Sequence, residues 1–247
     1  MLPLNSSRIF FPSSNWFFLL VLIYFLLVSG LPVEAQKPTK KNATAKEKTE
    51  KTLFEAMQAN PWSKITGFRS AKFEMNEKSV YRAIAKDFKM AKSKVKKITH
   101  PAEKTTILEI IVPDLFSIGG IAKVGYVLGF KSRKLIQVNV FWGKGFAEKV
   151  DGQAVVLTAN TLRTHFLKKR YIKDKLVVNG KLSDTHTIAF RGKDQKNRMI
   201  SLLLNVPRRQ EEETHEEALN NITLVLSYIA DPDNPDIRSI KVEEGEF

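Results

Sequence analysis

The chain contains no cysteine among its 247 residues. Disulfides, a thiolate nucleophile and a Cys-ligated metal are therefore excluded, and so is an N-terminal lipid modification, which requires a Cys after the apolar segment. Stability has to come from a packed core. Because extracellular animal domains usually carry disulfides, we expect a bacterial envelope compartment for an exported chain that lacks them.

Catalytic and metal-binding motifs are missing as well. HEEAL at residues 215–219 begins like the zinc-protease motif, but Leu219 stands where the second His ligand is required. Residues 231–236 alternate carboxylates like a calcium loop, yet they lack the turn Gly and the distal Glu, and two prolines favour a rigid acidic turn. We therefore predict no cofactor, no metal site and no catalytic residue.

Histidine offers the remaining route to acid–base chemistry. His186 alternates with Ile188 on one predicted strand face, and it could meet His165 near Asp184. An unrecognised periplasmic hydrolase that uses His165, His186 and Asp184 is therefore the alternative function. A His on an apolar face is more often a hydrogen-bonded structural residue, so a non-enzymatic protein is the main prediction.

One long apolar run is present, WFFLLVLIYFLLV at residues 16–28. It is followed by the helix breakers Gly30 and Pro32, and then by small residues at the positions that a signal peptidase reads. This pattern predicts a signal peptide over residues 1–35, cleaved between Ala35 and Gln36, and hence a periplasmic or secreted protein. The alternative is a membrane anchor formed by residues 16–31. Residues 36–52 are rich in Lys and Thr without apolar periodicity, which is typical of a disordered linker.

The charge is positive and unevenly distributed. The formal net charge is +14, of which residues 37–104 carry about +11, residues 105–206 about +10 and the part from Pro207 about −7. A basic body favours an anionic envelope component or an envelope protein as partner, with peripheral membrane contact. Nucleic acid fits less well, because export removes the chain from most of it and no nucleic-acid-binding fingerprint is present.

The densest cationic cluster predicted in the folded part follows the first helix. It is the candidate contact surface for an anionic partner, the alternative being a solvated face. Its members are Lys92, Lys94, Lys96 and Lys97.

The first folded half, residues 53–146, reads as one helix followed by strands. Asn76 is a plausible N-cap, and apolar residues recur every four positions from Val80 to Phe88, which predicts a helix over residues 77–88. A second short helical piece over residues 91–97 should end before Pro101. Three strands are predicted next. Their sequences are rich in β-branched residues or place apolar residues at alternate positions, and they span residues 105–112, 124–130 and 136–142. With a turn at residues 131–133, they predict a three-stranded antiparallel meander.

The second half, residues 147–230, repeats this order. Asp151 can cap a helix whose apolar face ends at Phe166, and Asn179-Gly180 is a type I′ hairpin signal. Further strands are expected at residues 185–190, 199–206 and 221–229, before an acidic, Pro-rich tail at residues 231–247. The fold class that we predict is α+β: antiparallel sheet with two main helices packed on one face, in a tandem helix-then-sheet arrangement.

The stretch FEMN at residues 73–76, followed by Val80, Ile84 and the meander, resembles a group of exported bacterial modules. This group includes the outer-membrane-assembly lipoprotein and the β-lactamase-inhibitor-like fold, and the resemblance covers residues 67–142. Its helix commonly follows Phe-Gly-Met-Thr or Phe-Gly-Met-Ser. This chain has Glu74 in place of the Gly and Asn76 in place of the Thr or Ser, and the anchoring Cys is absent. The resemblance implies a non-enzymatic adaptor or ligand-binding module.

Overall fold

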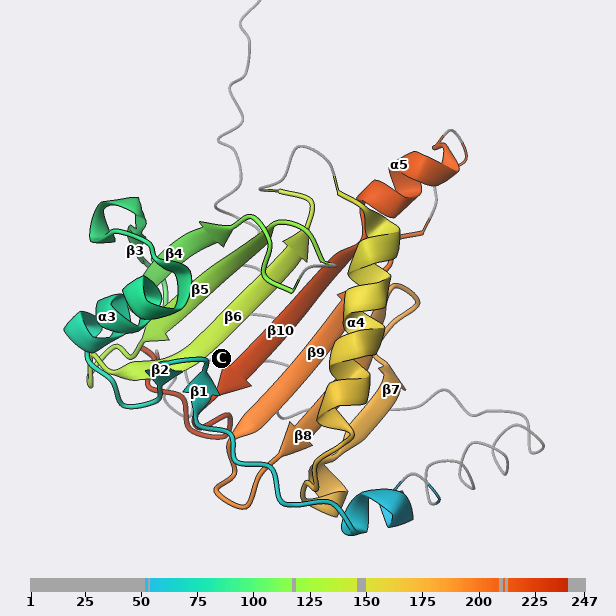
Figure 1. The fold of residues 1–247 in the computed structure, drawn as a ribbon, viewed down its shortest axis with the longest axis horizontal. Coiled ribbons are helices and arrows are strands. Elements are labelled where there is room, and N and C mark those ends of the chain that lie inside the picture. Colours follow the sequence, from blue (N-terminus) through green and yellow to red (C-terminus); the bar gives the residue numbers. More distant parts are fainter. Residues whose placement is uncertain are drawn as a thin grey trace, which may run out of the picture.

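The computed structural model describes residues 52, 54–116, 119–145, 150–208, 211 and 213–239. Their centre is an eight-stranded antiparallel sheet in the order β3-β4-β5-β6-β10-β9-β8-β7, with a separate two-stranded sheet, β1-β2. The two main helices, α3 and α4, lie on the same face of the large sheet (Figure 1). This arrangement confirms the predicted α+β class. The predicted signal peptide and nearly all of the predicted linker lie outside the described residues.

The chain builds the sheet from two successive units of one helix and four strands. The first unit comprises α3 (Glu77–Phe88), β3 (Lys96–Thr99), β4 (Thr106–Val112), β5 (Ala122–Leu128) and β6 (Leu135–Gly143). The second comprises α4 (Gly152–Phe166), β7 (Val177–Lys181), β8 (His186–Lys193), β9 (Met199–Asn205) and β10 (Thr223–Ile229). The last strand of each unit meets that of the other, because β6 and β10 pair at the centre of the sheet. The predicted tandem order is thus present, within one continuous sheet.

Helix α3 begins and ends where its sequence pattern predicts. The side chain of Asn76 accepts a hydrogen bond from the Ser79 backbone N–H at 2.9 Å, which satisfies one of the unpaired donors at the helix start. Val80 and Ile84 are fully buried, whereas Phe88 is half-buried with the Arg69 guanidinium 5.0 Å from its ring centroid. The expected full burial of Phe88 is therefore corrected: the last turn of α3 lies at the edge of the core.

The segment after α3 differs from the predicted helical piece over residues 91–97. A single 3-10 turn spans Lys92–Lys94, and Lys96 already begins strand β3 at the edge of the sheet. Edge strands are commonly rich in Lys, because the charge opposes pairing with other chains. The polar sequence KKIT is therefore compatible with an edge strand, although it lacks the apolar alternation that predicts one.

Helix α4 also follows its sequence pattern. Asp151 accepts a hydrogen bond from the Ala154 backbone N–H at 3.0 Å, and Val155, Ala159, Leu162 and Phe166 are buried. The helix contacts β6, β8, β9 and β10, so it covers the second unit and the central seam.

The hairpin turn predicted at Asn179-Gly180 is corrected. Both residues lie within β7, and Asn179 has no partner on β8, where Val178 pairs with Phe190 and Gly180 with Ile188. Asn179 has φ of 54°, and the register between β7 and β8 is the same on both sides of it, so its tolerance of the left-handed region allows a local distortion within the strand instead of a turn. The β7–β8 connection falls after Lys181.

A short helix in the polar insert was not predicted. Helix α5 (His215–Asn220) starts with a capping box, in which Thr214 and Glu217 exchange side-chain and backbone hydrogen bonds. Among the helices of the described residues, none has the length and apolarity needed to cross a membrane.

Apolar side chains pack on both faces of the large sheet. The larger cluster lies beneath α3 and α4 and includes Trp142, which is 1% exposed as its strand pattern predicts. The smaller cluster is on the opposite face and contains Ile107, Val127, Phe141, Ile188, Leu203 and Val225.

Candidate functional site: a cavity between α4 and the β1–β2 turn

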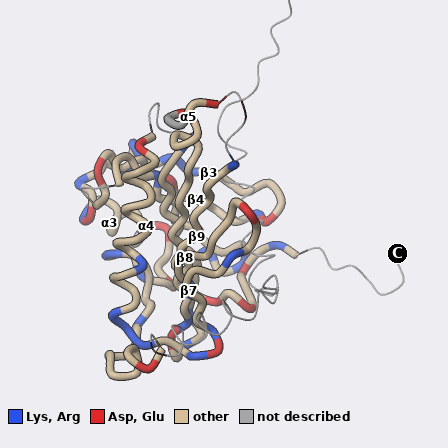
Figure 2. Tube along the Cα trace, turned by 90° about the vertical axis from the view of Figure 1, so that its right-hand side faces the viewer, with Lys and Arg blue, Asp and Glu red and all other residues tan. Residues whose placement is uncertain are grey.

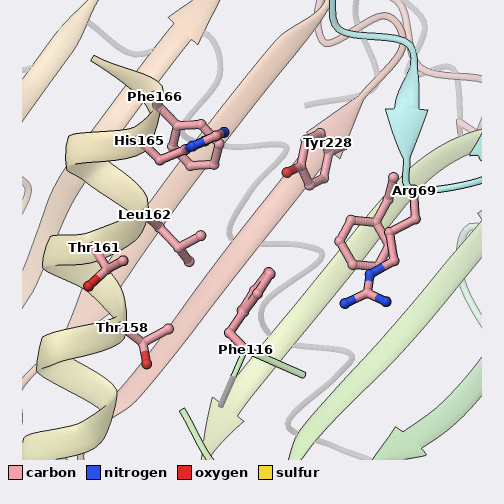
Figure 3. A pocket seen from close by; sticks show the side chains of 9 residues that line it. Arg69, Phe116, Thr158, Thr161, Leu162, His165, Phe166 and Tyr228 are labelled. Carbon is pink, nitrogen blue, oxygen red and sulfur yellow. The ribbon is translucent and has the colours of Figure 1, made fainter. Parts of the chain in front are cut away.

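A cavity of about 380 Å³ lies on the helix-covered face of the sheet, between α4 and the β1–β2 turn (Figure 3). The strands β1 (Gly67–Phe68) and β2 (Ala71–Lys72) form a small hairpin beside the central seam. The volume is near the lower end of the range typical of small-molecule sites. The lining residues are Phe68, Arg69, Phe116, Thr158, Thr161, Leu162, His165, Phe166 and Tyr228.

One wall of the cavity is the inner side of α4. Thr158, Leu162 and Phe166 recur every four residues and are buried, while Thr161 and His165 lie at the exposed margin of the same helix face. The Thr158 hydroxyl donates to the Ala154 carbonyl at 2.8 Å, so its methyl group is the part available to the cavity. This wall is therefore apolar inside and polar at the rim.

The opposite wall is the β1–β2 turn, which presents Phe68 and Arg69. The Asp87 carboxylate of α3 accepts a hydrogen bond from the Ser70 backbone N–H at 2.9 Å and so fixes the turn to the helix. Arg69, with φ of 51°, donates from Nη2 to the Leu115 carbonyl at 3.1 Å. Its guanidinium also lies over the Phe88 ring, and the guanidinium is held at the mouth of the cavity by these contacts.

The floor of the cavity is aromatic. Tyr228 of β10 lies 5.6 Å from Phe68, and Phe116 stacks on Trp142 of β6 with ring centroids 5.7 Å apart. Burial raises the pKa of Tyr228, so its hydroxyl stays protonated and uncharged. The floor thus combines apolar area with a neutral hydroxyl.

Trp142 brings a buried donor close to Thr158 and the cavity. Its Nε1 has no hydrogen-bond partner within the described part of the chain. A Cβ added to Gly119 would lie 2.8 Å from both Trp142 Nε1 and Thr158 Oγ1, so only glycine allows the loop to approach so closely. A buried N–H without a partner costs free energy, which favours a ligand or water that accepts from it.

The electrostatics of the cavity point to an anionic group at its mouth. Arg69 is permanently charged, and a guanidinium carries five N–H donors. No acidic side chain lines the cavity within the described residues. Nor does any cluster of three or more His, Asp or Glu that could hold a metal occur in this part of the chain. The lining therefore matches an apolar molecule with one anionic end.

The three residues of the alternative hydrolase lie at separate places. His165 is on α4 at the cavity margin, whereas His186 shares its strand face with Ile188, which belongs to the cluster on the opposite side of the sheet. His186 Nδ1 is 2.8 Å from the Thr185 hydroxyl, and burial lowers its pKa. Asp184 forms ion pairs with Lys181 and Arg208, whose hydrogen bonds lower the pKa of that carboxyl. The structure does not bring these side chains together around one reacting atom.

The four lysines of the predicted anionic contact are all exposed. Lys97 forms an ion pair with Glu77 at 2.8 Å, and the Lys92 ammonium lies 4.8 Å from the Tyr81 ring centroid. Lys96 and Lys97 are neighbours on β3, so their side chains leave opposite faces of the sheet. Lys94 is the last residue of the 3-10 turn that begins at Lys92.

The acidic segment at residues 231–236 serves as a structural tie. Asp236 accepts hydrogen bonds from the backbone N–H groups of Lys131 and Ser132, at 2.9 and 2.8 Å, at the β5–β6 turn. Asp233 accepts from Lys193 Nζ on β8 at 2.8 Å. These carboxylates thus hold two hairpins of the sheet, as expected for a rigid acidic turn.

Several cavity residues were not found by sequence reasoning. Phe68 and Arg69 precede the first helix, and Phe116 lies in a loop, so no periodic pattern distinguishes them. Thr158, Leu162 and Phe166 were predicted only as the buried face of a helix. The local signal was Arg69 itself, in the stretch GFRSA, and an Arg is common on protein surfaces.

No family model, curated protein or solved structure matches this chain. The resemblance to exported bacterial modules over residues 67–142 therefore stays a prediction.

Proposed function

We propose that the protein is an exported, non-enzymatic binding protein of the cell envelope, and that its cavity takes a small amphipathic ligand with an anionic end group. The apolar part would lie between Leu162, Phe166 and Tyr228, and the anionic end would be bound by Arg69 at the mouth. The observation that carries this proposal is the combination of an aromatic lining, which has no acidic side chain among the described residues, with one guanidinium fixed at the mouth. Export is supported by the signal-peptide pattern of residues 1–35.

Binding can be measured directly with a fluorescent fatty acid, cis-parinaric acid, and with its methyl ester as the uncharged counterpart. We expect Thr161→Trp to obstruct the cavity mouth and to weaken binding of both molecules by about tenfold or more. The matched control is Asn160→Trp, which adds the same side chain to the exposed outer side of the same helix. Thermal unfolding of both variants checks that α4 remains folded.

Arg69→Met separates recognition of the ligand's carboxylate from burial of its hydrocarbon chain. A hydrogen bond to a charged group contributes roughly 1.5–3 kcal/mol, so the variant should bind the acid about tenfold more weakly and the ester unchanged. Equal affinities of wild type, Thr161→Trp and Asn160→Trp would show that the ligand does not occupy this cavity. Equal losses for acid and ester in Arg69→Met would remove the role given to the cation.

A further inference from the structure

The C-terminal end of α4 and the connection to β7 carry a dense run of positive charge. Residues 163–175 contain six Lys or Arg against one Asp. Four lysines of this run are exposed, and none of them forms an ion pair within the described residues: Lys168, Lys169, Lys173 and Lys175. A helix C-terminus favours cations in its last turn, but the run continues well beyond that turn.

Two aromatic side chains lie among these cations. The Arg170 guanidinium is 4.3 Å from the Trp62 ring centroid, and Lys173 Nζ is 5.1 Å from that of Phe54. Both rings are half-buried, so each keeps part of its surface exposed. Backbone hydrogen bonds from Ser63 N–H to the Arg170 carbonyl, at 2.9 Å, and from Arg170 N–H to the Pro61 carbonyl, at 3.0 Å, fix the two segments together.

We refer to Phe54, Trp62, Lys168, Lys169, Arg170, Lys173 and Lys175 as the α4-end surface. Amphipathic aromatic rings beside cations are the composition that proteins present to the head-group region of a bilayer.

The other end of α4 has acidic groups close to it, whereas cations predominate at the α4-end surface. At the N-terminal end of the helix lie the acidic groups Asp151, Glu213 and Glu217, because α5 packs against that end. Figure 2 shows acidic segments near α5 and, beyond the other end of α4, basic segments with acidic ones between them. An anionic plane would attract the basic end and repel the acidic end, and so would orient the protein.

We propose that the α4-end surface docks on the anionic head groups of a phospholipid bilayer. Trp62 and Phe54 enter the head-group region, while the lysines contact the phosphates. His165 and Thr161 lie within two turns of Lys168, so docking brings the cavity mouth near the bilayer. The docking surface does not depend on the cavity, since none of its side chains lines it.

Co-sedimentation with vesicles tests the surface. The protein is the chain from Gln36 onward, because it contains every described element and both apolar clusters, whereas the apolar run at residues 16–28 would itself enter a bilayer. The vesicles are phosphatidylcholine with or without phosphatidylglycerol, at low and high salt. We expect binding only to the anionic vesicles, weakened by salt.

Two quadruple variants with the same change of charge provide the comparison. One replaces the four lysines of the α4-end surface by Gln, and the other replaces Lys92, Lys94, Lys96 and Lys97 by Gln. Each Lys near an anionic surface strengthens binding about fivefold, so the first variant should lose roughly 100-fold or more in partitioning. The second should change it by less than about tenfold, because Lys97 is paired with Glu77 and because Lys96 and Lys97 leave opposite faces of the sheet.

Fluorescence reports the aromatic contact. The chain from Gln36 contains Trp62 and Trp142, and Trp142 is 1% exposed, so a blue shift on adding anionic vesicles reports Trp62. The proposal would be overturned if both quadruple variants lost vesicle binding equally, or if the second lost more than the first. Vesicle binding without a shift of Trp62 emission would also overturn it. Vesicle binding that persists in Thr161→Trp while parinarate binding is lost would leave the docking surface valid and separate it from the cavity.

Discussion

Replacement of Glu103 by Gln should stabilise the protein at neutral pH. Glu103 lies in the connection between β3 and β4 and is 5% exposed. Its backbone N–H donates to Nδ1 of His100 at 3.0 Å, and its carbonyl accepts from the Arg238 backbone N–H at 2.9 Å. Neither carboxylate oxygen has a hydrogen-bond partner within the described chain, and burial raises the pKa of Glu103 from an ordinary value of 4.5 to about 7.

The direction of the pH effect follows from proton binding. Between pH 4.5 and about 7 the folded state holds a proton on Glu103 that the unfolded state has released, so the unfolding free energy falls as the pH rises through this window. Each unit of pKa shift corresponds to about 1.4 kcal/mol, which gives a loss of roughly 3 kcal/mol above pH 7. Gln keeps the size of the side chain and removes the charge. The unfolding free energy of the variant should therefore equal that of the wild type near pH 4 and exceed it by about 3 kcal/mol near pH 8.

Urea unfolding of both proteins across this pH range measures the difference. Burial lowers the pKa of His100, which has the opposite effect on stability. His100 Nδ1 lies 3.9 Å from Glu103 Oε2, so the two groups are coupled, and the variant is compared with the wild type near pH 8, where His100 is neutral in both proteins. Glu55→Gln, at an exposed position, is the control for a general change in net charge. Parallel stability curves for wild type and Glu103→Gln would refute the assignment of a protonated, buried carboxyl at this turn.

Three further outcomes are expected. Trp142→Ala should lower the unfolding free energy by roughly 3–5 kcal/mol, because it removes a fully buried indole, and an unchanged melting temperature would contradict its place in the core. Asn76→Ala should cost about 1 kcal/mol through the lost N-cap, whereas Asn76→Ser should restore most of it. N-terminal sequencing of the exported protein should begin at Gln36; full-length chain that resists carbonate extraction from membranes would indicate the anchor instead.

The elements that sequence reasoning found are those with strong local signals. The capped amphipathic helices α3 and α4 were predicted to within about a residue at each end, since Asn76 and Asp151 mark their starts and apolar spacing marks their buried sides. The strands of the core were found through β-branched and alternating residues. Strand β3 was missed because KKIT has no apolar alternation. Asn179 was mistaken for a turn residue because an Asn with positive φ is typical of hairpin turns, whereas here it lies within β7.

The cavity could not be found in this way, because its walls come from distant parts of the chain. Phe68, Phe116, Leu162 and Tyr228 are brought together only by the pairing of β6 with β10 and by the position of the β1–β2 turn. Each of them reads locally as an ordinary core residue. Only tertiary structure shows that the space between them is not filled by other side chains.

The central position of β10 has a consequence for chains that end early. Loss of β10 would divide the large sheet into β3–β6 and β7–β9, and would leave the long strands β6 and β9 with open backbone edges. Such edges carry apolar residues on both faces and no neighbouring strand, which is the combination that promotes pairing between molecules. A chain cut before Thr223 should therefore aggregate instead of folding as a smaller protein, although seven of the eight strands would still be encoded.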